Sequence, residues 1–90
     1  MRGDAEDRPI RLSAHANGHG GRRGFSVSQV EEAINLGDWV FIGDSRFECS
    51  QTFLFDSDWN GKHYASITVR PIFVELEEEI LVVTVYTYYH

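Results

Sequence analysis

Histidine, arginine and hydroxyl side chains gather near the two ends of this chain. His15 and His19 stand four residues apart, and the glycine-rich stretch around them leads to Arg22 and Arg23 just before a helix start. Guanidinium groups beside the backbone N–H groups of a helix N-terminus suit a phosphate. The same stretch is equally typical of a flexible, solubilising loop. The sequence therefore marks His19, Arg22 and Arg23 as candidate phosphate ligands and leaves both interpretations open.

The last strand-like segment carries a row of hydroxyl groups. Thr84, Tyr86 and Tyr88 alternate with apolar or less polar residues, so they share one face of a strand. Such a row could bind phosphate oxygens or orient a ribose. The simpler alternative, that Thr and Tyr are good strand formers on a half-buried surface, is favoured on sequence alone.

A metal site is the other chemistry that His15 and His19 could support. An i, i+4 pair lies on one face of a helix turn and can ligate a metal ion. No third ligand follows at a recognised spacing, and the intervening glycine weakens the helix. We therefore expect no metal and no other cofactor.

One helix is well marked. Ser26 is a favourable N-cap, Gln29 completes a capping box, and Gly37 ends the segment, so the sequence predicts a helix over 27–36. Its apolar residues Val30, Ala33 and Ile34 fall on one face. Upstream, the glycines of 13–24 predict no more than a helical turn at 13–17, followed by a flexible loop.

The rest of the chain has the pattern of strands and tight turns. Asn60-Gly61 is a strong hairpin signal, 77–79 is an acidic turn, and Pro71 indicates an edge, a bulge or a break in a strand. The sequence thus predicts an α+β fold with an N-terminal helical segment packed on a four- to five-stranded antiparallel sheet. Residues 1–12 are expected to be a flexible arm and residues 13–90 a single domain.

Composition indicates the number of domains and the cellular compartment of the protein. Of the 90 residues 42% are hydrophobic, which is enough for one folded domain. A single cysteine, Cys49, excludes an intrachain disulfide, suits a reducing compartment and is expected to pack as a small hydrophobe. The N-terminus lacks the apolar run of a signal peptide, and no segment has the roughly 20 apolar residues that span a bilayer. These features predict a cytoplasmic protein without a membrane contact.

Charge is divided unevenly along the chain. The net charge is −6, but residues 1–24 have five arginines against three acids, a net +2, and residues 25–90 have three basic residues against eleven acids, a net −8. Proteins that bind nucleic acid non-specifically are normally basic. This balance argues against that class and confines any phosphate site to a small positive patch.

The two polar ends resemble a known family. His15-Ala16, the element Arg23-Gly24-Phe25-Ser26 and the helix ending at Gly37 look like the opening of small bacterial domains of the domain-of-unknown-function 4258 family, and 80–86 is similar to the closing strand of that family. The likeness covers about residues 13–88. Such domains are similar to the RelE and barnase-like group of small ribonuclease toxins. The family often has an arginine where this chain has His19.

This resemblance implies RNA cleavage without a metal ion. His15, Arg23, Thr84 and Tyr86 then match the catalytic positions. A histidine can act as base or acid near neutral pH, arginines can hold the phosphate, and a tyrosine or His90 could be the partner acid. The implied partners are RNA and a cognate antitoxin or immunity protein.

A second class of function remains open. The acidic body could dock on a basic protein target, as an inhibitor or adaptor that mimics nucleic acid. A third alternative is a domain that keeps the family fold without catalysis. Edge strands around Pro71 leave dimerisation open.

Overall fold

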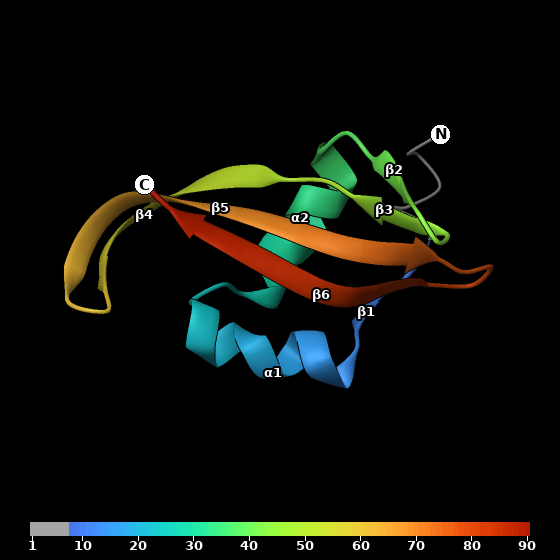
Figure 1. Cartoon of the computed structure of the whole chain (residues 1–90), viewed down its shortest axis with the longest axis horizontal. Helices are drawn as coiled ribbons and strands as arrows, with labels where there is room; N and C mark the ends of the chain where they lie inside the picture. Colours follow the sequence, from blue (N-terminus) through green and yellow to red (C-terminus); the bar gives the residue numbers. More distant parts are fainter. Residues whose placement is uncertain (1–7) are drawn as a thin grey trace.

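A computed structural model describes the chain from residue 8 to residue 90, without the side chains of residues 19–23. Within this range the chain is a small α+β domain with two helices and a six-stranded mixed sheet (Figure 1). The elements are β1 (Ile10–Leu12), α1 (Ala14–Arg23), α2 (Val27–Leu36), β2 (Val40–Gly43), β3 (Arg46–Glu48), β4 (Gln51–Trp59), β5 (Lys62–Glu75) and β6 (Ile80–Tyr89).

The sheet differs from the predicted one in strand number and direction. Its order is β1-β6-β5-β3-β2, with β4 also pairing β5, and β1 runs parallel to β6 while the other pairs are antiparallel. Residues 10–12, assigned from the sequence to the flexible arm, form β1. Ile10 and Leu12 pack against the core, and the backbone N–H of Ser13 bonds to the carbonyl of Val82 at 2.9 Å. A three-residue strand has too little pattern to be recognised without this partner.

Strand β5 lies in the interior of the sheet, and two different strands pair with the same edge of it. Its first part pairs with β4 and its last part with β3. Pro71 lies between these two regions, where its carbonyl accepts a bond from the backbone N–H of Cys49 at 3.4 Å. Proline has no N–H to donate, so it is tolerated where one neighbouring strand ends and the next begins. One residue after Pro71, between Ile72 and Phe73, the pairing register of β5 with β6 shifts.

Helix α2 has the predicted bounds. The Ser26 side chain accepts a bond from the backbone N–H of Gln29, and the Gln29 side chain accepts one from the Ser26 backbone, which completes the capping box. Val30, Ala33 and Ile34 are buried, as expected for the apolar face. Gly37 ends the helix in an extended conformation.

Helix α1 corrects the prediction of a loop after residue 17. The segment remains helical to residue 23 despite its glycines. Ala16 is fully buried in the core, and the Ser13 hydroxyl accepts a bond from the Ala16 backbone N–H, as an N-cap side chain does. Packing against β6 thus overrides a low helix propensity.

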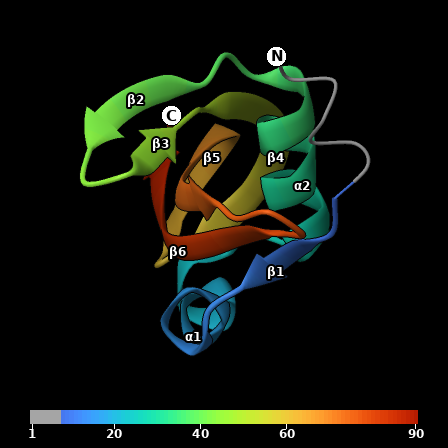
Figure 2. The ribbon, with the colours of Figure 1, turned by 90° about the vertical axis from the view of Figure 1, so that its right-hand side faces the viewer.

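Both helices pack on one face of the sheet and leave the other open (Figure 2). The core joins the helices to inward side chains of β5 and β6, with Phe73, Ile67, Ile80 and Val82 among its largest fully buried residues. Cys49 is buried as predicted, and its thiol donates to the Ala33 carbonyl at 3.3 Å. No helix within residues 8–90 is long and apolar enough to cross a membrane.

Candidate functional site

A pocket of about 400 Å³ lies on the open face of the sheet, between the β2–β3 hairpin and strands β5 and β6. Backbone alternation explains which side chains reach it. In β6 Val85 is buried toward the helices, so its neighbours Thr84 and Tyr86 face the opposite side. The pocket is lined by Ile42, Gly43, Asp44, Arg46, Glu48, Arg70, Ile72, Thr84 and Tyr86.

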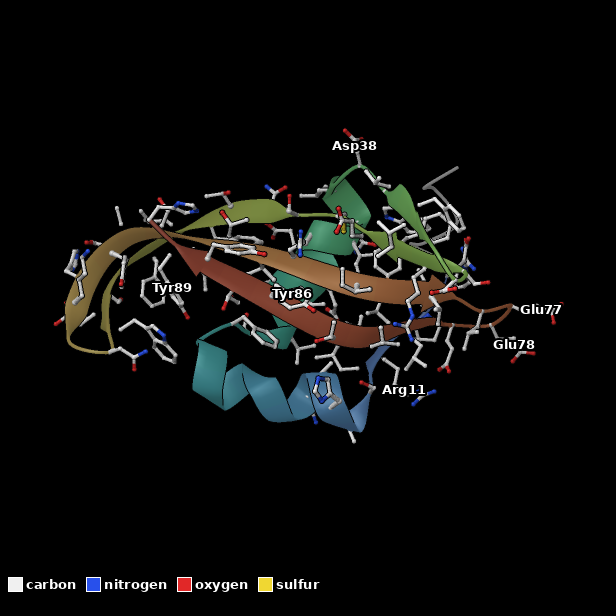
Figure 3. All side chains as sticks on the ribbon, in the orientation of Figure 1. Arg11, Asp38, Glu77, Glu78, Tyr86 and Tyr89 are labelled. Carbon is white, nitrogen blue, oxygen red and sulfur yellow. The ribbon has the colours of Figure 1, made fainter. Side chains whose placement is uncertain are left out.

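Strand register brings the central polar groups of the pocket together. Arg70 stands opposite Tyr86 across the β5–β6 pair, and Ile72 stands opposite both Thr84 in β6 and Glu48 in β3. Three strands therefore contribute to one small area. Tyr86, which is 40% exposed, lies on the sheet in Figure 3.

Arg70 is the most constrained polar side chain of the pocket. Its guanidinium carbon lies 5.0 Å from the centre of the Tyr86 ring and 5.7 Å from that of Tyr88, which is the geometry of a cation–π contact. Its Nη1 is 3.5 Å from Oε1 of Glu48. Its Nε is buried and has no hydrogen-bond partner among the described residues. A guanidinium held between two rings and a carboxylate presents directed donors, which suit an oxyanion such as phosphate.

The pocket is close to neutral although the body of the protein is acidic. Arg46 and Arg70 line it together with Asp44 and Glu48. Glu48 is half-buried, whereas Arg46 and Asp44 are exposed. The pocket can thus supply both cations for a phosphate and a carboxylate for proton transfer.

The structure places only part of the site predicted from the sequence. Thr84 and Tyr86 line the pocket, and Thr84 is half-buried there. His15 is an exposed residue of α1 and is not among the residues that line this pocket. The side chains of Arg23, His19 and Arg22 lie outside the described residues, so their predicted roles stay predictions.

The charged residues of the pocket, Asp44 among them, were missed by sequence reasoning. Arg70, Arg46 and Glu48 come from segments that the sequence showed only as strands. The one available signal was the alternation around Arg70, which puts it on the same strand face as Thr68 and opposite buried Val69. Alternation identifies a face but not the strand that will lie beside it.

Hydroxyl and imidazole groups continue along the open face toward the C-terminus. The hydroxyls of Thr52 and Thr68 are 2.8 Å apart, and Nε2 of His90 is 2.9 Å from the Thr68 hydroxyl. His90, one of the two acids considered from the sequence, is thus hydrogen-bonded to Thr68 and does not line the pocket.

A second polar cluster occupies the β4–β5 hairpin. Nδ1 of His63 is 3.1 Å from Asp58, and Nε2 is 3.0 Å from Asp56. The hydrogen bonds to Asp58 and then Asp56 raise the pKa of His63 above its usual 6.5. Both ring nitrogens are engaged by carboxylates, and no group of three His, Cys, Asp or Glu side chains in the described part of the chain is arranged to hold a metal ion.

Comparison with known proteins gives no relative for this chain. No protein-family model, curated protein or solved structure matches it. The resemblance to the domain-of-unknown-function 4258 family therefore stays a prediction that depends on the residues named above.

Proposed function

We propose that this chain is a small metal-independent ribonuclease domain and that the sheet-face pocket binds the scissile phosphodiester. The observation that carries the proposal is the setting of Arg70. Its guanidinium is held over Tyr86, beside Glu48, with Nε buried and without a hydrogen-bond partner among the described residues. A preorganised cation next to a carboxylate and a phenol is the combination that phosphodiester cleavage needs.

The proposed reaction is attack of a ribose 2′-oxygen on the adjacent phosphorus. Glu48 takes the proton from the 2′-hydroxyl, and Tyr86 gives a proton to the departing 5′-oxygen. The P–O5′ bond breaks as the P–O2′ bond forms, which leaves a 2′,3′-cyclic phosphate and a 5′-hydroxyl. Arg70 and Arg46 offset the charge that develops on the phosphorane, and Thr84 orients a phosphate oxygen.

The acidity of the body limits how RNA can bind. Residues 25–90 carry a net −8, so contacts with many successive phosphates are disfavoured. The two arginines of the pocket can neutralise about two phosphates. A plot of the logarithm of the RNA association constant against the logarithm of the salt concentration should therefore have a slope of roughly −1 to −2 for single-stranded RNA. The domain should therefore contact only a short stretch of RNA and bind it weakly.

The test is cleavage of a fluorescent single-stranded RNA by the purified chain, with identification of the product ends. We expect a 2′,3′-cyclic phosphate, no inhibition by EDTA, and no cleavage when the 2′-hydroxyl at the cut site is replaced by hydrogen. Arg70→Met should lower the rate by a factor on the order of 100 or more, the usual effect of removing one transition-state donor. Arg11→Met, which removes the same charge at the β1 ion pair with Glu79, is the matched control and should change the rate by less than about twofold.

Further variants test the catalytic role proposed for each residue. Glu48→Gln and Tyr86→Phe should each lower the rate while circular dichroism shows an unchanged fold. His15→Ala and Arg23→Ala test the roles predicted from the sequence with the same assay. Absence of cleavage by the wild-type chain, or equal cleavage by Arg70→Met and Arg11→Met, would overturn the proposal.

A further inference from the structure

Strand β2 is an edge of the sheet whose side chains are apolar and exposed. Val40, Phe41 and Ile42 are 53%, 63% and 45% exposed. On one side β2 pairs with β3, and no described strand pairs with it on the other. Its outer N–H and C=O groups are therefore available to another strand.

The other edges of the sheet carry charged residues, which β2 lacks. Strand β1 has only three residues, follows Pro9 and carries Arg11 in its middle. Strand β4 has an irregularity between Leu54 and Ser57 and carries two acids in its second half. Short length, charge, proline and bulges are the usual means of blocking edge-to-edge pairing. Strand β2 is also short and has an irregularity between Phe41 and Gly43, but it contains no charge and no proline.

Charge decides what kind of strand fits this edge. Asp38 and Asp44 are exposed and flank β2 on its two sides, and Asp38 points outward in Figure 3. Residues 36–48 hold three acids and one arginine, a net −2. An added strand therefore meets an apolar centre between two carboxylates, so basic residues at its ends are complementary to the edge.

The same charges disfavour a second copy of this chain. In a symmetric antiparallel β2–β2 pair centred on Phe41, Asp38 of one copy would stand opposite Asp44 of the other at both ends. Like charges directly opposite each other destabilise a strand pair, and each copy carries a net −6. Residues 1–7 of this chain are also a poor occupant, because they have three acids, one arginine and no apolar run.

We propose that β2 is a docking edge for a protein partner that adds an extended segment with an apolar centre and a basic residue at each end. Backbone hydrogen bonds of the added strand supply affinity, and the two aspartates select its ends. The surface shares Ile42, Gly43 and Asp44 with the sheet-face pocket, whereas Asp38, Val40 and Phe41 do not line that pocket. Docking at this edge does not require ribonuclease activity.

The test uses a capped seven-residue peptide, acetyl-Lys-Thr-Val-Ile-Val-Thr-Lys-amide, titrated into the full chain and followed by amide chemical shifts. Its length matches residues 38–44, so its lysines can stand opposite both aspartates in either direction. We expect shifts centred on 38–44 and binding at least tenfold weaker for the same peptide with glutamate ends. Raising the salt concentration should reduce this difference.

Two substitutions locate the contact. Phe41→Lys places a charge in the edge and should weaken binding of the lysine-ended peptide at least tenfold. Leu54→Lys makes the same change at a residue of β4 that is 84% exposed, and it should leave binding within about twofold. The double variant Asp38→Asn, Asp44→Asn should reduce the preference for lysine over glutamate ends at least fivefold.

Three results of the titration would overturn the proposal. The first is the absence of amide chemical-shift changes up to millimolar peptide. The second is equal binding of the lysine-ended and glutamate-ended peptides. The third is chemical-shift changes centred on another acidic segment, such as the 77–79 turn. Sedimentation is measured in parallel. A dimer that Phe41→Lys dissociates would assign the edge to a second copy instead of a basic partner.

Discussion

Replacing Gly37 by alanine should destabilise this protein, although the same change usually stabilises. The φ angle at Gly37 is −80°, a value that alanine adopts without strain, so loss of chain entropy in the unfolded state alone would favour Gly37→Ala by about 0.4–1 kcal/mol. A Cβ at this position would, however, lie 2.6 Å from the Ala33 carbonyl oxygen and 3.2 Å from the Cβ of Cys49. The first contact is with helix backbone and cannot relax by a rotamer change. We expect net destabilisation of about 1–3 kcal/mol, the usual effect of overpacking a buried site.

Gly18→Ala is the matched control for this prediction. Gly18 lies within α1, and a Cβ there would have no atom within 4 Å. Alanine in a helix interior is favoured over glycine by roughly 0.5–1 kcal/mol, so this variant should gain stability. Urea unfolding of both variants measures the difference. A Gly37→Ala protein as stable as the wild type would refute the close-approach argument, because it would show that the backbone at residue 37 moves freely away from the Ala33 carbonyl and Cys49.

Two further predictions concern the β4–β5 hairpin and the α2 cap. Because Asp58 and Asp56 raise the pKa of His63 in the folded chain, protonated His63 stabilises the fold below its unfolded pKa of about 6.5, and this contribution is lost as the pH rises through the raised value. NMR titration should show a pKa above 6.5 that falls more in Asp58→Asn than in Asp56→Asn, and equal shifts would contradict the order of the two contacts. Ser26→Ala should lower the free energy of unfolding by about 1 kcal/mol, as measured in urea, because the N–H of Gln29 loses its cap. No loss of stability would mean that the capping box contributes nothing to the folded chain.

The proposed ribonuclease site combines sequence-predicted and structure-derived residues. Thr84 and Tyr86 were identified from their spacing on one strand, and the structure adds Arg70 and Glu48 beside them. The pocket lies in an otherwise acidic domain, which separates this proposal from general nucleic-acid binding. The β2 edge concerns a protein partner and is tested independently of RNA.

Local signals of the sequence determined several elements of this fold. Helix α2 has the predicted bounds because its cap, its apolar spacing and its terminal glycine act within a few residues of one another. The hairpin at Asn60-Gly61 forms as predicted, with both residues at positive φ, the conformation that this pair adopts readily. The burial of Cys49 also followed from its alternation with aromatic residues.

Only the tertiary structure decided the remaining elements and the candidate site. Helix α1 and strand β1 depend on contacts with β6, so propensity and pattern within 10–23 did not reveal them. The pocket depends on the register that puts Arg70 beside Tyr86 and on the hairpin that brings Glu48 near both. Register is a property of two strands and of the irregularity between them. No single segment of sequence therefore specifies which side chains will meet.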